Sequence, residues 1–525
     1  MSVPQSVINI CENIPLDNRY DHTFYWENRD DQAAYFASKV VKTFTGYSYL
    51  RKSWDIKVAA DHSTTNTWNY LYFTNGGLTY YYFINDIEYI DDSTVKLFLE
   101  LDVIQTYACL YNLLPCFVER QHVTNDSIGA NLVEEGLELG EMVTKGLIDV
   151  QLGELCIMVL SSFELEGTGE GNFTPATPTT IHGIFSGLAL YAIDLSMANQ
   201  WGKELQYFDE KGKSEGIVAM WMYPKQLVSI YDESWTGHLY HKVKNIVPFF
   251  NNIARPETLA GSYNPRNNKL YTYPYNFLYV TNNDGTVAEY RYENFDDPSF
   301  CNFKIVGAIS PEGGVRMYPL NYLSEQNAYE HGLSLGNYPT CAWNQDVYKL
   351  WLAQNQNQNR LTVINGAAKI AGGLALTALS GATGGLSGAA SLGMIASGVS
   401  QVLEHVARVS DESVQPPQAK GQISSSLNIA AGFQCFTMKQ KSIKPGMAAI
   451  IDDYFTMYGY KINRMQIPNP RARQNYTYIK TVGCKITGNI PKADMTKIES
   501  IFDKGVTFWV GGVSIGDYGL NNNPV

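Results

Sequence analysis

The sequence feature that most constrains the fold is a strict alternation of side chains between residues 95 and 104. Five aliphatic residues alternate there with a mixed set: Val95, Leu97, Leu99, Leu101 and Val103 against Lys96, Phe98, Glu100, Asp102 and Ile104. A period of two residues places the two sets on opposite faces of a β-strand. The turn-forming Asp91-Asp92-Ser93 precedes this strand, so the sequence predicts a β-hairpin over residues 79–106.

Further short strand patterns continue to about residue 345. They cover residues 71–80, 269–295 and 302–310, and the dipeptides Asn75-Gly76 and Asp284-Gly285 supply turns between strands. Aromatic residues make up 13% of the chain and charged residues only 17%, which is typical of β-rich chains that bury large surfaces against partners. We therefore expect a mainly β fold of barrels or sandwiches.

The 525 residues are too many for a single ordinary core, and composition divides them into four consecutive segments. We expect β-rich domains at residues 1–150 and 151–345, a long insertion at 346–432, and an α+β segment at 433–525. In the last segment, apolar residues from Met447 to Tyr458 have helical spacing before Gly459. A second helix is expected from Pro491 to Gly505.

The insertion contains 34 consecutive residues without a charge, between Lys369 and Glu404, and 22 of them are Gly, Ala, Ser or Thr. The stretch is long enough to span a bilayer once, although its hydropathy is marginal. Small residues recur every fourth position from Gly373 to Ser397, a pattern that favours helix packing in lipid. A Gly/Ala-rich flexible or internally packed loop explains the same composition, so both interpretations stay open.

If the stretch is membrane-active, it forms a helical hairpin that turns near Gly384-Gly385. The residues that we assign to this membrane-active loop are Ile370, Leu374, Leu376, Leu379, Gly381, Gly384, Gly385, Leu386, Leu392, Met394, Ile395, Val399, Val402 and Leu403.

Two groups of charged residues were considered as catalytic candidates. Arg120, His122 and Asp126 lie close together in a β-rich region, where such a set usually forms a buried polar network. Glu134 and Glu135 resemble half of a hydrolase carboxylate pair, but neighbouring residues point in different directions and a solvated face is expected. We therefore expect no catalytic residue in either group.

A metal or cofactor site is not expected either. His238 and His241 have the spacing that places two ligands on one helix face, but no third ligand accompanies them. We expect the sequence to offer no catalytic GxSxG, HExxH, Walker or GxGxxG motif. We expect a protein that is not an enzyme and needs no cofactor.

Several motifs together resemble one family, and they occur in its order along the chain. One runs from Leu99 through Glu100, Leu101, Asp102, Val103, Ile104 and Gln105 to Thr106, and continues with Phe117, Val118, Arg120, His122, Val123, Asp126 and Gly129. A second covers residues 317–358, and a third covers residues 452–469, 478–494 and 501–510. The chain thus resembles the tail-knob (distal tail tube) proteins of phi29-like short-tailed bacteriophages.

The resemblance implies tandem β-barrel or sandwich tube domains that assemble, with other phage tail proteins such as the lower collar, into a homo-hexameric tube. Apolar loops would plug the tube, then penetrate the host cytoplasmic membrane while genomic double-stranded DNA passes. A net charge of −12 and the lack of any Lys/Arg-rich run favour passage over binding of DNA. The alternative is a receptor- or cell-wall-binding tail protein without pore activity.

The expected location is the distal end of the virion tail, after synthesis in the host cytoplasm and before membrane insertion during infection. The eight cysteines contain no CxxC pair and are expected to be reduced thiols. The first residues show no charged region followed by an apolar core, so no signal peptide is expected.

Overall fold

The computed structural model describes residues 5–48, 55–185, 187–232, 234–283, 285–310, 313–335, 340–341 and 435–525. Contacts group the chain into two compact units, each built from separate stretches: residues 1–141, 261–275 and 443–525 in the first unit, and 142–260 and 276–442 in the second. The described residues form mainly β-sheet with some helices, as predicted. The four consecutive segments defined by composition stay a prediction.

The N-terminal sheet of the first unit has six strands, all paired antiparallel. Their order is β3 (Val40–Ser48), β1 (Gln5–Glu12), β5 (Trp68–Asn75), β6 (Leu78–Asp91), β7 (Thr94–Leu101) and β4 (Asp55–Val58). The predicted hairpin is confirmed for β6 and β7, which pair through the turn with Asp91 opposite Thr94 and Tyr82 opposite Leu101. Its predicted end at residues 103–106 was wrong, because these residues form a short helix and Val103 and Ile104 are both buried. Val95, Leu97 and Leu99 are buried on one face of β7, as the alternation requires.

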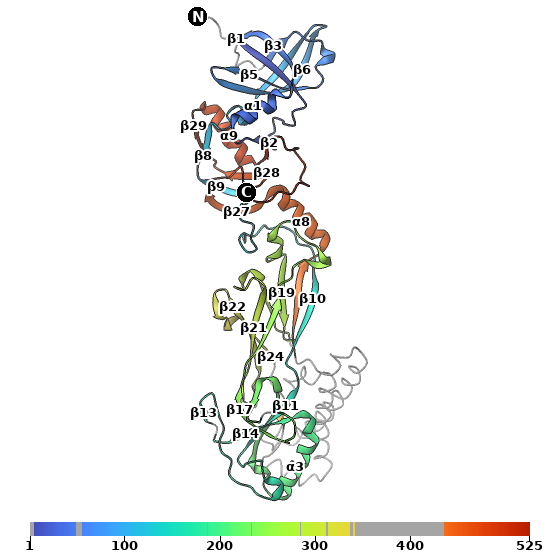
Figure 1. Cartoon of the computed structure of the whole chain (residues 1–525), viewed down its shortest axis with the longest axis vertical. Helices are drawn as coiled ribbons and strands as arrows, with labels where there is room; N and C mark the ends of the chain where they lie inside the picture. Colours follow the sequence, from blue (N-terminus) through green and yellow to red (C-terminus); the bar gives the residue numbers. More distant parts are fainter. Residues whose placement is uncertain are drawn as a thin grey trace, which may run out of the picture. The chain divides into compact units, whose positions relative to one another are not determined.

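The second sheet of this unit combines strands from both ends of the chain. Its order is β2 (His22–Tyr25), β30 (Val506–Val510), β28 (Tyr476–Val482), β9 (Cys116–Gln121) and β27 (Tyr460–Gln466). Only β2 and β30 run parallel among these pairs. Figure 1 shows the cyan strand β9 together with the orange-to-red strands β27 and β28 in this region. The small ladder of β8 (Tyr111–Leu113) and β29 (Ile486–Gly488) joins the same two parts of the chain.

In the described part of the first unit there are four α-helices: α1 (Arg29–Ala37), α2 (Val103–Thr106), α8 (Pro445–Tyr458) and α9 (Lys492–Lys504). Both helices predicted near the C-terminus are confirmed. Gly459, with a φ of 63°, ends α8, and Gly505, with a φ of 101°, ends α9. Pro491 caps the start of α9. These boundaries follow from local chemistry, since only glycine readily adopts a positive φ.

The second unit contains three larger sheets. The first has the order β10 (Met142–Gln151), β26 (Cys435–Ile443), β19 (Asn276–Thr281) and β20 (Val287–Tyr290). The second has the order β16 (Val228–Ile230), β17 (His241–Ile246), β14 (Ala189–Asp194), β11 (Leu155–Ser161), β15 (Ile217–Pro224) and β25 (Thr340–Cys341). The third has the order β18 (Phe249–Ala254), β21 (Phe300–Gly307), β22 (Val315–Tyr322) and β23 (Glu325–Asn327), with β24 (Leu333–Leu335) also paired to β22.

Shorter elements also occur among the described residues of the second unit. They are the ladder of β12 (Thr180–Ile181) and β13 (Ile184–Phe185), and helix α3 (Ala198–Glu210). Helix α3 buries Trp201, Leu205 and Phe208 in a cluster with Val159 and Tyr191, which belong to β11 and β14. This spacing of three and four residues gives the helix one apolar face.

Single-turn 3₁₀ segments connect many of these elements. They are His62–Thr64 and Asn268–Tyr271 in the first unit, Ala260–Ser262 where the chain leaves the second, and Thr168–Glu170, Leu195–Met197, Ser214–Gly216, Lys225–Leu227, Tyr292–Asn294 and Tyr329–His331 in the second unit.

A buried polar cluster joins the predicted hairpin to the rest of the first unit. Asp102, Gln105 and Thr106, from the first family motif, are fully buried at the end of β7 and in α2. The Asp102 carboxylate accepts hydrogen bonds from the Tyr70 hydroxyl at 2.9 Å and from the Gln105 backbone N–H at 3.1 Å. The Gln105 side-chain oxygen accepts from Trp26 Nε1 at 2.7 Å. The motif therefore has a structural role, because each buried polar group finds a partner.

Burial raises the pKa of Asp102 to about 6, from an ordinary value of 3.8. The folded protein thus holds this proton more tightly than the unfolded chain does. The stability that protonated Asp102 contributes to the folded state is fully present below pH 4 and is lost as the pH rises through 6.

We expect Asp102→Asn, which stays uncharged, to become more stable relative to the natural chain as the pH rises from 4 to 7. The change should be about 2–3 kcal/mol, because two pKa units correspond to about that energy. Urea unfolding at the two pH values measures it, and Asp86→Asn, at an exposed site of the same hairpin, is the control. An Asp102→Asn effect that does not vary with pH would contradict the assignment.

Candidate functional site

A buried ionic cluster lies in the first unit and includes Arg120, from the first family motif. Glu135, whose side chain is only 1% exposed, forms ion pairs with both Arg120 and Lys269. Those two side chains are themselves 10% and 3% exposed. The Lys461 backbone N–H donates to Glu135 Oε1 at 3.0 Å, and Arg120 Nη1 donates to the Gly459 carbonyl at 2.7 Å. Each of the three charges is therefore compensated inside the unit.

The expectation that Glu135 belongs to a solvated face was wrong. Glu134 is exposed, but the next side chain turns inward between two cations that are 15 and 134 positions away in the sequence. Burying a carboxylate is tolerated when paired charges and hydrogen bonds surround it. No local sequence pattern reveals those partners.

His122 lies next to this cluster and is held by both ring nitrogens. Its Nδ1 accepts a hydrogen bond from the Tyr478 backbone N–H at 2.8 Å, so the proton resides on Nε2, which donates to the Thr456 carbonyl at 3.1 Å. Burial and the nearby Arg473 charge lower the pKa of His122 to about 3. The imidazole is therefore neutral at pH 7 and serves as a rigid link rather than as a proton carrier.

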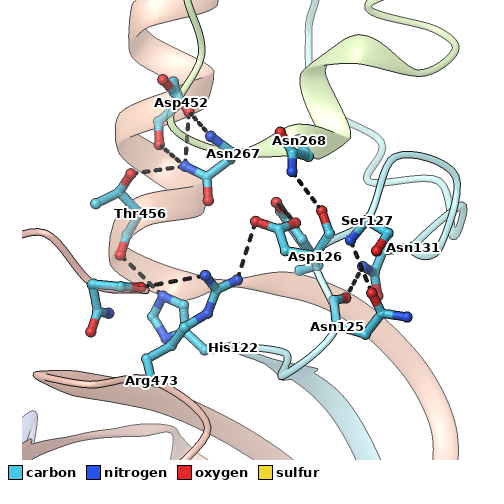
Figure 2. A network of polar contacts seen from close by, with 12 residues as sticks. His122, Asn125, Asp126, Ser127, Asn131, Asn267, Asn268, Asp452, Thr456 and Arg473 are labelled. Carbon is cyan, nitrogen blue, oxygen red and sulfur yellow. Dashed lines mark hydrogen bonds and ion pairs between the residues drawn. The ribbon is translucent and has the colours of Figure 1, made fainter. Parts of the chain in front are cut away.

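A second set of bonds fastens residues 263–269 to helix α8, as Figure 2 shows for Asn267. The Asp452 carboxylate is fully buried and accepts from the Tyr263 hydroxyl at 2.8 Å and from the Asn267 backbone N–H at 3.1 Å. Asn267 Nδ2 also donates to Asp452 Oδ1 at 2.8 Å and to Thr456 Oγ1 at 2.9 Å. Asp452 lies four residues after Ala448 on the buried face of α8. The helical spacing in the sequence therefore contained a signal that Asp452 is buried.

Asp126 completes the arrangement. Its carboxylate accepts from the Tyr460 hydroxyl at 2.6 Å and lies 3.4 Å from Arg473 Nη2, while its backbone carbonyl accepts from Asn268 Nδ2 at 2.8 Å. The prediction that Arg120, His122 and Asp126 form a buried polar network is therefore confirmed. We call this set of residues, with Glu135, Lys269, Asn267 and Asp452, the polar junction. It connects all three stretches of chain that make up the first unit.

The histidine pair lies elsewhere, in the second unit, and its assumed helix is wrong. His241 begins strand β17, and His238 precedes it outside any helix, with the two rings 6.1 Å apart. His241 Nδ1 lies 2.6 Å from the Asp232 carboxylate. Among the residues that the structure describes, no group of three or more His, Cys, Asp or Glu side chains could hold a metal ion.

The GxSxG pattern is present in the sequence, contrary to the expectation. Residues 332–336 read Gly-Leu-Ser-Leu-Gly and match GxSxG, which in hydrolases places the serine on a sharp strand-to-helix turn. Here Ser334 lies in the middle of strand β24, paired with Arg316 of β22. The strand geometry does not present Ser334 as such a nucleophile.

The predicted membrane-active loop, from Ile370 to Leu403, lies outside the described residues. In the part of the chain that is described, no helix combines the length and apolarity needed to cross a bilayer.

Known proteins that this chain resembles are phage tail proteins. The family model for the C-terminal domain of the Bacillus phage phi29 tail knob protein gp9 matches residues 240–523, and the model for the caudoviral major tail protein N-terminus matches residues 4–110. The tail knob protein gp9 of Bacillus phage B103 is 25% identical and that of Bacillus phage PZA 24% identical, with 98% of each chain covered. The solved tail knob protein gp12 of bacteriophage C1 matches with a TM-score of 0.67 at 15% identity, covering 99% of this chain and 100% of that chain.

The fold and these matches define a structural protein of the bacteriophage tail. Because the matching model spans more than half of the residues, the chain belongs to the family of the phi29 tail knob protein gp9. Its location is therefore the virion tail, where it assembles with other phage tail proteins.

Gly459 tests how tightly the polar junction is packed. A Cβ atom added at Gly459 would lie 2.4 Å from the backbone of Gln121 and from the backbone nitrogen of His122, and the φ angle of Gly459 is positive. Gly483 has a similar φ of 68° but nothing within 4 Å. We expect Gly483→Ala to cost about 1–2 kcal/mol from backbone strain. Gly459→Ala should cost about 1–3 kcal/mol more from overpacking.

Urea unfolding of both variants measures the difference, and the Gly483 variant is the matched control. Equal losses of stability in the Gly459 and Gly483 variants would mean that the end of strand β9 moves freely away from the added methyl group. The polar junction would then not be tightly packed.

Proposed function

We propose that the chain is one subunit of a hexameric distal tail tube through which the genome leaves the virion. The observation that carries this proposal is the match to tail knob proteins over 98% of the chain, which includes the uncharged stretch of the insertion. In this proposal the loops of residues 365–409 plug the tube before infection. They then leave the tube and penetrate the host cytoplasmic membrane.

Charge supports a conduit that lets DNA slide. The chain carries 51 acidic and 39 basic residues, and a wall of the same sign as phosphate keeps DNA from adhering. Salt weakens this repulsion beyond about 10 Å at 0.1 M ionic strength, so it acts mainly near the wall. Binding of DNA by base readout is not part of the function.

The length of the hairpin arms supports insertion by several copies together. Each arm of a hairpin that turns at Gly384-Gly385 has about 15 residues and a helical length near 22 Å, at about 1.5 Å per residue. That is short of the roughly 30 Å hydrocarbon core. One hairpin is therefore a poor spanning element, and six copies can instead line a water-filled pore, where irregular backbone is tolerated.

The proposed tube requires that six copies of the chain form a ring. Closure into a ring removes exposed sheet edges and favours a defined number of copies. Native mass spectrometry of the purified full-length chain at micromolar concentration should give six copies, and electron-microscopy class averages should show a central hole. A chain that stays monomeric in solution and in the virion would overturn the tube.

The membrane role predicts a separable defect. Leu376, Leu379, Leu392 and Ile395, all changed to Asp, should leave the oligomer intact and abolish dye release from liposomes, because buried charges oppose insertion. A control variant changes four exposed apolar residues of the described part to Asp: Leu147, Val218, Val287 and Ile450.

The control should retain dye release once native mass spectrometry shows the same oligomer. Unimpaired release by the loop variant would overturn the membrane role. Binding to purified cell wall by a chain that releases no dye would instead support the receptor- or wall-binding alternative.

A further inference from the structure

A polar pocket of about 620 Å³ opens in the first unit beside the polar junction. Three parts of the chain build it: residues 124–127 after strand β9, residues 266–268, and residues 519–524 near the C-terminus. Arg473 and Tyr476 supply further wall. The volume lies within the roughly 300–1,000 Å³ typical of small-molecule sites. The pocket plays no part in the proposed conduit.

The lining excludes an apolar ligand. Apart from Leu520, Pro524 and Gly519, every lining residue carries a polar side chain. Covering such groups with hydrocarbon would remove their water without replacing its hydrogen bonds, at a cost of about 1–3 kcal/mol for each group. The occupant must therefore be rich in hydrogen-bonding groups.

One wall residue retains unused donors. The Arg473 side chain is only 8% exposed, yet its two contacts, with the Asp126 carboxylate and with the Asn522 carbonyl, are both long at 3.4 Å. Arg473 Nε is buried and has no hydrogen-bond partner among the described residues. A guanidinium group carries five donors, so Arg473 can bond to a further acceptor in the pocket.

The charges around the pocket balance one another. Arg473 faces Asp126, and Arg266 Nε lies 3.8 Å from the buried Asp452 carboxylate. His122 adds no charge at neutral pH, because burial lowers its pKa to about 3. A full charge on the ligand would find no uncompensated partner, whereas hydroxyl groups can both accept from Arg473 and donate to Asp126.

We propose that this pocket binds a neutral polyhydroxylated ligand of one or two sugar rings. Asn125, Asn268 and Asn523 add amides to the lining, and an amide can accept from one sugar hydroxyl and donate to another. The site is part of the described first unit and is independent of the uncharged stretch in the insertion.

Saturation-transfer NMR on the full-length chain tests the proposal, with glucose and N-acetylglucosamine as separate probes. Line broadening in phosphorus NMR tests inorganic phosphate as a third probe. Thr124 lines the pocket and is exposed, so Thr124→Trp should fill the pocket without removing a buried contact. We expect signal from at least one sugar, and at least tenfold weaker binding in the Trp variant. Thr487→Trp, exposed in strand β29 and outside the pocket, is the matched control and should bind normally.

Three results would overturn the assignment. They are no signal from either sugar with the folded chain, equal sugar binding by the Thr124 and Thr487 variants, and phosphate that binds in place of the sugars. Arg473→Lys keeps the charge but loses the planar fork of donors, so it should weaken sugar binding at least threefold. Unchanged thermal unfolding of the Lys variant would separate lost recognition from lost folding.

Discussion

The first unit depends on one buried carboxylate. Glu135 is almost inaccessible to water, so its charge is tolerable only while Arg120 and Lys269 both pair with it. Removing Glu135 would leave the two buried cations without their shared partner, and leaving a buried charge uncompensated typically costs about 3–5 kcal/mol. The three residues come from two stretches of chain, and the neighbouring Asp452, Asn267 and His122 contacts add the third. The pairing therefore specifies which segments of the chain must meet.

This requirement explains what the family motifs do. Asp102 and Gln105 anchor the hairpin of strands β6 and β7, and Arg120 and His122 anchor strand β9. These side chains are engaged by protein groups on nearly every side, as catalytic residues awaiting a substrate are not. Motifs of this kind identify a tail knob protein through its architecture.

The pocket differs from the junction beside it in the state of its hydrogen bonds. In the junction, the Asp452 carboxylate and the His122 ring nitrogens have close partners, with distances of 2.8–3.1 Å. In the pocket wall, the contacts of Arg473 are longer and one of its donors is unused. A rigid wall with spare donors and acceptors is preorganised for a ligand, since little ordering is needed on binding. The junction would thus serve both the fold and the binding site.

The sequence by itself determined the local elements. Alternation at residues 95–101 specified strand β7, the preceding Asp91-Asp92-Ser93 specified its turn, and apolar spacing with Gly459 and Gly505 specified the C-terminal helices and their ends. These signals are local, because a period of 2 or 3.6 residues and a positive φ are properties of a few neighbouring residues. The buried network of Arg120, His122 and Asp126 was also predictable in kind, although not in its partners.

Only the tertiary structure decided which distant segments share a unit. It turned Glu135 inward, placed His241 at the start of a strand with His238 before it outside any helix, and put Ser334 in the middle of β24. It also placed strand β9 between β27 and β28, more than 300 residues later in the chain. The physical reason is that the ionisation and burial of a side chain depend on partners far away in the sequence. No periodicity along the chain identifies those partner residues.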